Sequence, residues 1–278
     1  MPVSANPYVS DLDCYLFDLN GFLVLKQALS RQEVSGLNTV LDAIPFLEPG
    51  QWHGNVQAHQ YGGSDGLNLQ QVYEAGEPFE QLIDHPAWFE RVKHFVGGEG
   101  TFDCHHGPLF IDENFANFRE PGGGIGLHSG GDTGIKRNQF RYHNGRFQCG
   151  QINILMALTD IGPGDGATMV VPCSHKASFP HPHAGQAREA VDGVEGAIEV
   201  FLEKGDALLF TDTLSHGSAR RVNPGVRRIV VYRYGPSWGN FRHGYQPSAE
   251  LLARLAPVRR QIVQPLQLIP RPQGKQGV

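Results

Sequence analysis

With 278 residues, of which 40% are apolar and 18% are charged, the chain suits one large domain with a sizeable core, and global disorder is excluded. Its formal net charge of −5 gives no sign of a nucleic-acid surface or a polybasic membrane patch. No apolar run approaches the roughly 20 residues that a membrane span needs.

The first residues and the cysteines predict a cytoplasmic protein. The opening MPVSANPYVSDLD has neither the basic region nor the apolar region of a signal peptide. The four cysteines are far apart in the chain and form no CxxC motif. We therefore expect reduced thiols, as in a reducing compartment, at Cys14, Cys104, Cys149 and Cys173.

The N-terminal hundred residues predict helices and loops. Residues 12–29 are typical of a short helix, a turn at Asn20-Gly21 and a strand, and Ser30 with Glu33 forms a capping box for a second helix. Residues 48–78, rich in Gly, Gln and His, predict a long loop that could cover a substrate. Residues 77–96 predict a helix that is broken at His85-Pro86.

From residue 101 onward the pattern changes to short apolar runs between turn clusters. Such spacing predicts an antiparallel sandwich or barrel. We expect one domain over residues 1–278, with a helical and loop part (1–100), a β core (101–236) and a C-terminal extension (237–278). The predicted strands are Pro108–Ile111, Gln151–Leu158, Thr168–Val171, Ile198–Leu202, Ala207–Phe210 and Ile229–Tyr234.

Two histidines and an arginine are the candidate site residues. His216 follows an apolar strand, and Arg227 begins another apolar run eleven residues later. An imidazole can bind a metal, and a planar guanidinium can bind a carboxylate through two hydrogen bonds. His128 lies 88 residues before His216, but strands far apart in sequence pair in a jelly roll. Because neighbouring strand residues face opposite sides, only one of Arg227 and Arg228 can enter the barrel, and the spacing favours Arg227.

Several segments together resemble the phytanoyl-CoA dioxygenase family of iron(II)/2-oxoglutarate oxygenases. They are FDLNGFLVLKQALSRQEV, LTDIGPGDGATMVVPCSHKASF, and GDALLFTDTLSHGS followed by RRIVVYRY, within residues 12–236. Cys173 stands where that family usually has glycine. The resemblance implies a mainly β fold with flanking helices, a double-stranded β-helix (a cupin-like jelly roll) preceded by N-terminal helices.

The resemblance also implies cofactors and site residues. His128 and His216 match the two iron ligands, and Arg227 matches the arginine that pairs with the distal carboxylate of 2-oxoglutarate. Ser218 matches a hydroxyl that often lies beside the distal histidine. Asn153, or Gln151 in the same apolar strand, is a further candidate either for contact with the keto acid or for support of a residue that binds it, because a polar residue facing into a barrel must be paired. Molecular oxygen would be the second co-substrate.

The chain departs from the family at the carboxylate of the 2-His-1-carboxylate triad. The His-x-Asp position reads His128-Ser129-Gly130. In one explanation, Asp132 reaches the metal through the flexible Gly130-Gly131. In a second, a halide or water fills the gap at Gly130, as in related halogenases. In a third, the metal site has decayed. The remaining possibility is a carboxylate from elsewhere, such as Glu113, Glu120 or Asp212.

These features predict a dioxygenase that oxidises, most simply by hydroxylation, a small-molecule metabolite. The alternatives are a halogenase with chloride at the Gly130 gap and a non-catalytic jelly-roll binding protein. The sequence has no strong basic patch for the phosphates of coenzyme A, which favours a free small molecule. Neither the substrate nor the oligomeric state follows from the sequence. Aromatic residues that could line a substrate pocket, or equally pack in the core, are Trp52, Tyr61, Trp238 and Phe241.

Overall fold

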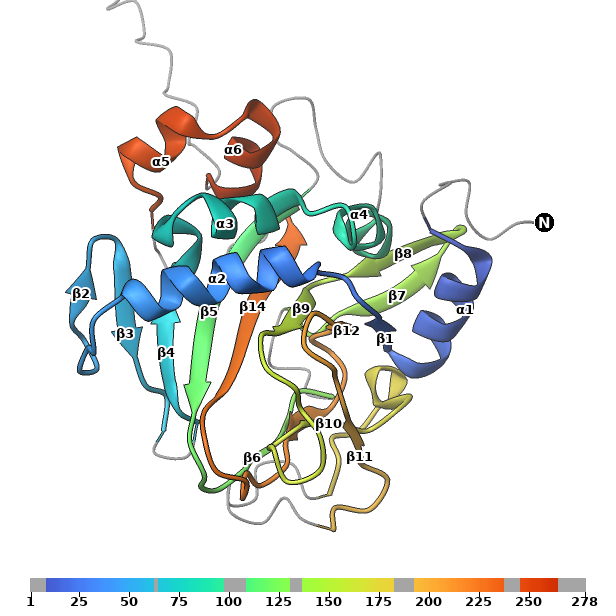
Figure 1. Cartoon of the computed structure of the whole chain (residues 1–278). Coiled ribbons are helices and arrows are strands. Elements are labelled where there is room, and N and C mark those ends of the chain that lie inside the picture. Colours follow the sequence, from blue (N-terminus) through green and yellow to red (C-terminus); the bar gives the residue numbers. More distant parts are fainter. Residues whose placement is uncertain are drawn as a thin grey trace, which may run out of the picture.

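The largest element of the fold is an antiparallel sheet of eight strands. It is seen in a computed structural model that describes residues 9–62, 65–97, 109–130, 137–182, 193–237 and 246–264. Sequence-distant strands lie side by side in this sheet (Figure 1). In spatial order its strands are β1 (Phe22–Leu25), β12 (Ala207–Thr211), β9 (Ile152–Ala157), β14 (Arg227–Pro236), β5 (Leu109–Arg119), β4 (Leu67–Gln70), β3 (Val56–His59) and β2 (Trp52–His53).

A second, smaller sheet has four strands and carries both candidate histidines. Its order is β11 (Ile198–Val200), β10 (Thr168–Val170), β13 (His216–Ser218) and β6 (Ile125–His128). A separate ribbon pairs β7 (Phe140–His143) with β8 (Arg146–Cys149). An apolar cluster joins the large sheet to the small one, including Phe115, Leu155, Phe210, Ile229 and Val231 of the former and Val170 and Val200 of the latter.

The helices lie over the other face of the large sheet. They enclose a larger core, which contains Phe17, Leu37, Phe79, Ile154 and Tyr232. Ser10 with Asp13 and Ser30 with Glu33 form capping boxes, which confirms the predicted start of the second helix. The helices are α1 (Asp11–Asn20), α2 (Arg31–Ala43), α3 (Glu77–Glu80), α4 (Phe89–Val96), α5 (Ala249–Arg254) and α6 (Pro257–Val263), with 3₁₀ turns η1 (Val72–Ala75), η2 (Gln81–Asp84) and η3 (Ser174–Lys176).

The alternation of side chains along β14 separates the two cores. Val230 and Tyr232 belong to the core beneath the helices, whereas Ile229 and Val231 belong to the core between the sheets. This is the two-residue period of a strand that is buried on both faces. β14 is hydrogen-bonded to β5 on one side and β9 on the other, so both neighbours fix its register.

The prediction of a loop over residues 48–78 is wrong. This segment contains β2, β3, β4 and η1, and β4 pairs with β5 of the predicted β core. The apolar residues Val56, Ala58 and Leu69 are buried in these strands. The polar residues Asn68 and Gln70 of β4 are buried as well, so the segment lacks a clear alternation of apolar and polar residues. The expected boundary near residue 100 therefore does not divide the fold, because strands on both sides of it share one sheet.

Cys173, which stands where the family usually has glycine, lies in the turn that precedes η3. Cys173 has a φ of +69°, in the left-handed region that glycine enters without steric cost. Its Sγ donates to the carbonyl oxygen of Leu19 at 3.0 Å, which ties this turn to the end of α1. Cys14, Cys149 and Cys173 all carry free thiols, and Cys104 lies outside the described residues.

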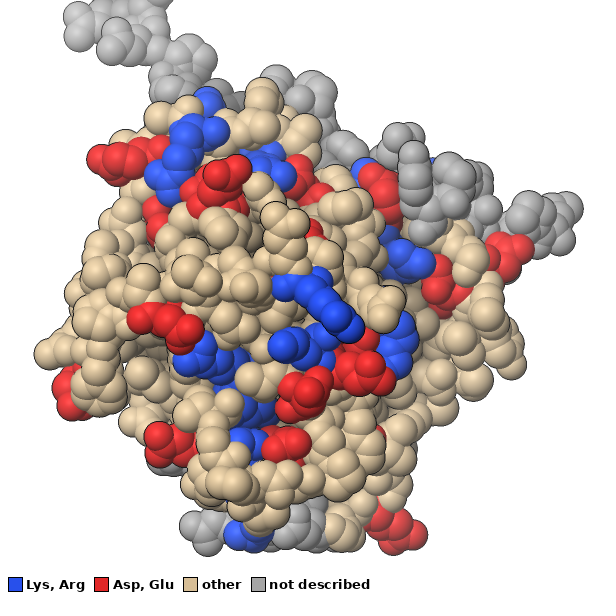
Figure 2. All heavy atoms as spheres, in the orientation of Figure 1, with Lys and Arg blue, Asp and Glu red and all other residues tan. Residues whose placement is uncertain are grey.

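The distribution of surface charge and the lengths of the helices agree with what the amino-acid composition predicts. Basic and acidic side chains are interspersed on the face shown in Figure 2, without an extended patch of one sign. Among the residues that the structure describes, no helix has the length and apolar character required to cross a membrane.

Candidate active site

The pairing of β13 with β6 brings the two candidate histidines together. His216 and His128 are register partners, and their ring centroids are 4.1 Å apart. The Nδ1 atom of His216 lies 2.7 Å from the carbonyl oxygen of Leu214, and that of His128 lies 3.1 Å from the carbonyl oxygen of Gly126. A backbone carbonyl at Nδ1 places the ring proton there and leaves the lone pair on Nε2. In this tautomer Nε2 is the nitrogen of each imidazole that can coordinate a metal.

The surroundings of His216 keep it neutral. Burial is the main cause, and the neighbouring His128 adds to it; together they lower the pKa of His216 to about 3, although Asp212 opposes the shift. Because only neutral imidazole can bind a metal, His216 is in the ligand form across the physiological pH range. His128 is exposed, so the pair has one buried and one accessible member.

The histidines line a cavity of about 460 Å³ between the two sheets. Its apolar wall includes Phe115, Leu155, Phe210, Ile229 and Val231. Polar side chains at its ends include Tyr61, Asn68, Asn117, Arg137, Thr168, Ser218, Arg227 and Arg233. The volume is in the range of small-molecule binding sites.

Arg227 is buried in the wall of this cavity with 4% of its surface exposed. It donates to Asn117 Oδ1 at 3.0 Å and to the carbonyl oxygen of Gly166, and it has no ion pair within the described part of the chain. Burial, together with the nearby Arg119 and Arg221, lowers its pKa to about 9. An anion in the cavity would relieve this accumulation of positive charge.

Ser218 is placed to donate a hydrogen bond into the same region. Its Oγ accepts from Arg119 Nη1 at 2.5 Å and from the backbone nitrogen of Ile125 at 3.1 Å. A hydroxyl has two acceptor positions and one donor. Both acceptor positions are used, so the Ser218 O–H remains to bind an oxygen of a ligand.

Glu113 and Asp212, two of the carboxylates considered as a third metal ligand, are paired with other side chains of the protein. Glu113 accepts from Gln70 Nε2 at 3.2 Å and from Tyr61 OH. Asp212 Oδ2 pairs with Arg137 Nε at 2.7 Å. Glu120 is exposed and lines a different pocket. Among the described residues, no group of three or more His, Cys, Asp and Glu side chains could hold a metal ion. Asp132 lies outside the described residues.

Asn153 lies behind the cavity wall, where it contacts a carboxylate of the protein, so of its two predicted roles the placement favours support of the site, and its contact with the keto acid stays a prediction. Asn153 is fully buried, does not line the cavity, and donates from Nδ2 to Asp212 Oδ1 at 3.0 Å. Gln151 likewise donates to Asp112 Oδ2 at 3.0 Å. The amide nitrogens of both residues in this apolar strand are therefore paired with carboxylates within the protein.

The backbone at Gly130 explains why no side chain stands at the usual carboxylate position. Ser129 and Gly130 both have left-handed backbones, with φ values of +62° and +61°. A Cβ added to Gly130 would lie 2.7 Å from Cβ of Ser215, the residue before His216. Gly130 is thus packed against the start of β13, and the direction that a side chain would take is filled by protein.

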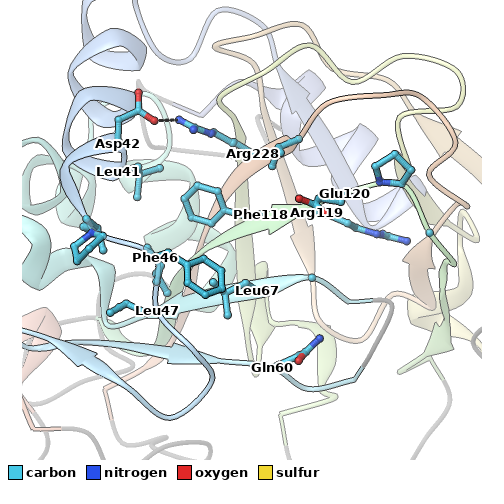
Figure 3. Close-up of a pocket in the computed structure, with 17 residues that line it drawn as sticks. Leu41, Asp42, Phe46, Leu47, Gln60, Leu67, Phe118, Arg119, Glu120 and Arg228 are labelled. Atoms are coloured by element: carbon cyan, nitrogen blue, oxygen red, sulfur yellow. Dashed lines mark ion pairs between the residues drawn. The ribbon is translucent and has the colours of Figure 1, made fainter.

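Arg228 points away from the histidines. It pairs with Asp42 of α2 at 2.7 Å and lies 5.3 Å from the ring centroid of Phe118. Figure 3 shows this pair at a second pocket, of about 630 Å³, between α2 and the outer face of the large sheet. Phe46 and Leu67 also line that pocket. The sequence preference for Arg227 over Arg228 agrees with this placement, while its ligand remains a prediction.

Sequence reasoning missed several residues of the cavity, chiefly Arg233 and Asn117. Arg233 has a sequence signal, because it is six residues after Arg227 on one strand and so faces the same side. Of the predicted aromatic residues, Tyr61 lines the cavity, Trp52 is half exposed in β2 and does not, and Trp238 and Phe241 lie outside the described residues.

Comparison with known proteins decides the family. The model of the family described as phytanoyl-CoA dioxygenase (PhyH) matches residues 17–229. The chain belongs to the phytanoyl-CoA dioxygenase family. This confirms both the predicted family and the predicted oxidoreductase class.

Two known dioxygenases are similar to this chain in sequence. The chain is 28% identical to dioxygenase cdmD of Talaromyces verruculosus over 136 residues, which cover 48% of this chain and 41% of that protein. It is 22% identical to peroxisomal phytanoyl-CoA dioxygenase of Rattus norvegicus over 241 residues, or 80% of this chain and 67% of that one. The alignment with the fungal protein thus spans less than half of its length.

Solved structures confirm the predicted jelly-roll fold. HygX from Streptomyces hygroscopicus, with nickel, 2-oxoglutarate and hygromycin B bound, superposes with a TM-score of 0.66 and 25% identity. The superposition covers 86% of this chain and 92% of HygX. The epimerase SnoN, in complex with Fe³⁺, α-ketoglutarate and nogalamycin RO, has a TM-score of 0.57 and 16% identity, which shows likeness of fold alone. It covers 91% of this chain and 93% of SnoN.

Proposed function

We propose that this family member is an Fe(II)- and 2-oxoglutarate-dependent dioxygenase that hydroxylates a small-molecule metabolite and forms succinate. The observation that carries the proposal is the pairing of two features on one cavity. One is the His128–His216 pair, whose Nε2 atoms can coordinate a metal, and the other is a buried Arg227 that has no ion pair among the described residues. An iron ion and a keto-acid carboxylate are what these two features would bind. The nickel and 2-oxoglutarate named with HygX support the same cofactor class.

Each residue has a distinct role in this proposal. His128 and His216 hold the iron, and Arg227 binds the distal carboxylate of 2-oxoglutarate while the Ser218 O–H donates to the same group. Phe210, whose ring centroid is 4.8 Å from that of His216, limits the access of water to the buried histidine. With molecular oxygen, bound iron and 2-oxoglutarate supply the oxidising chemistry, and the protein contributes positioning and a dry cavity.

For the third protein ligand we propose Asp132. The packing of Gly130 against Ser215 supports a carboxylate from farther along the chain over a halide beside Gly130, because that direction is already filled. Hydroxylation is therefore favoured over halogenation as the outcome of the reaction.

Binding of 2-oxoglutarate tests the proposal directly. Under anaerobic conditions, Fe(II) and 2-oxoglutarate should give the visible charge-transfer band of a chelated complex. Arg227→Gln should raise the Kd for 2-oxoglutarate by about 100-fold, because it removes a charge-assisted bidentate contact. Arg141→Gln, an exposed arginine of β7, is the matched control and should leave this Kd unchanged. Absence of the band and of succinate formation would instead support a non-catalytic binding protein.

Replacement of Asp132 by alanine separates the two possible metal sites. If Asp132 is the third ligand, Asp132→Ala should lower iron affinity by at least about tenfold, since a coordinating carboxylate is lost. Anaerobic iron titration, with and without added chloride, measures this. A chloride-dependent shift of the visible band that survives Asp132→Ala would contradict the proposal and support a halide at the metal.

A further inference from the structure

Besides Arg227, β14 contributes Arg233 to the wall of the cavity that contains the histidines. Arg227, Ile229, Val231 and Arg233 all line the cavity and share the inner face of this strand. At about 3.3 Å per residue, the Cα atoms of the two arginines are roughly 20 Å apart. β14 therefore places one arginine on each side of an apolar stretch of the cavity wall.

The histidines lie between these two cations. Ser218, two residues after His216 on β13, accepts from Arg119, the register partner of Arg227. On the other side, the ring of His216 contacts that of Phe210, which pairs across the sheet with Asn153, the register partner of Arg233. The charge of Arg233 also contributes to lowering the pKa of His216. A keto acid held at Arg227 thus leaves Arg233 on the far side of the histidines.

The guanidinium of Arg233 is held in place and retains donors. Among the described residues, its Nε forms an ion pair with Glu113 Oε2 at 3.3 Å, and its central carbon lies 5.4 Å from the ring centroid of Phe115. Glu113 is itself fixed by Gln70 and Tyr61. Among the described residues, the Arg233 side chain donates no hydrogen bond, and it is 17% exposed. An arginine has five N–H donors in a planar fork, so the edge away from Nε suits a carboxylate.

We propose that the substrate is a carboxylic acid whose carboxylate binds Arg233 while the carbon to be oxidised lies at the histidine pair. This inference rests on the proposed function and adds the substrate class to it. Arg227 serves the co-substrate and Arg233 serves the substrate, and the apolar wall between them receives the carbon skeleton. The ring of Phe115 holds the guanidinium plane, as aromatic faces commonly do for arginine.

The test compares acids with their uncharged amides. The protein is loaded with Ni(II) and 2-oxoglutarate, which prevents turnover and occupies the Arg227 end. Calorimetry then measures the Kd values of phenylacetate, hydrocinnamate and hexanoate, each beside its primary amide. At least one acid should bind about tenfold or more tightly than its amide, because it gains a charge-assisted pair.

Variants assign that preference to one residue. Arg233→Gln should remove the preference for the acid, and Arg233→Lys should keep part of it, because lysine retains the charge without the fork. Arg141→Gln should keep all of it. Equal binding of acids and amides, no binding of any acid at millimolar concentration, or a preference that survives Arg233→Gln would overturn the inference. Failure of the protein to bind 2-oxoglutarate before any acid is added would overturn the proposed function instead.

Discussion

Replacement of His216 by alanine should abolish iron binding while the fold persists. His216 is the buried member of the pair, and its Nδ1 contact with Leu214 fixes the ring so that Nε2 can coordinate. We expect iron affinity to fall by more than about 100-fold, because loss of supporting contacts alone costs 10–100-fold at metal sites. The visible band of the Fe(II)–2-oxoglutarate complex should disappear with it.

The measurement is metal content after anaerobic reconstitution, with circular dichroism as a check of folding. His143→Ala is the matched control, because His143 is an exposed histidine on β7, away from the cavity. It should bind as much iron as the unaltered protein. Stoichiometric iron and an intact band in the His216 variant would show that the metal binds elsewhere.

Replacement of Gly130 should damage the site even when the new side chain is a potential ligand. Gly130→Ala places a Cβ at 2.7 Å from Ser215 Cβ in a left-handed backbone. Left-handed conformation costs an ordinary residue about 1–2 kcal/mol, and overpacking costs about 1–3 kcal/mol. The free energy of unfolding should therefore fall by roughly 2–5 kcal/mol, measured by urea denaturation. Gly130→Asp should be no more stable and should not tighten iron binding.

Gly122→Ala provides the control for this substitution. A Cβ at Gly122 would meet no atom within 4 Å, and its backbone is not left-handed. Its free energy of unfolding should be unchanged or rise by up to about 1 kcal/mol, since alanine restricts the unfolded chain. A Gly130→Asp protein with unaltered stability and tighter iron binding would show that position 130 faces the metal.

Much of the fold was predictable because local signals agreed with it. The Ser30–Glu33 capping box starts α2, and the apolar runs after residue 101 became strands, most of them with ends shifted by one or two residues. The exception is β5, which continues to Arg119, eight residues past its predicted end. β14 extends past its predicted ends because pairing with β5 supplies hydrogen bonds from Arg227 to Pro236. The strands within residues 48–78 escaped prediction because tertiary pairing, not apolar alternation, holds Asn68 and Gln70 in β4.

Some features of the site were likewise predictable from the sequence, and others were not. His216 and Arg227 follow from their spacing and the strand period, and the cavity brings both together with His128. The conformation at Gly130 could not be inferred, because it depends on contact with Ser215, far away in sequence. Asn153 was predicted to contact the keto acid or to support a residue that binds it. Its amide nitrogen donates a hydrogen bond to Asp212, a residue that no local sequence pattern connects to Asn153.

The double pairing of β14 also sets how this enzyme can change during evolution. A one-residue shift in the register of the strand would exchange its two faces, turning Arg227 toward the helices and the apolar residues beneath the helices toward the cavity. Point substitutions at Ile229 and Val231 reshape the cavity and the core between the sheets, while Val230, Tyr232 and Tyr234 continue to hold the helices in place. New specificities are therefore accessible by exchange of alternate residues along one strand, provided that the apolar volume between the sheets is kept.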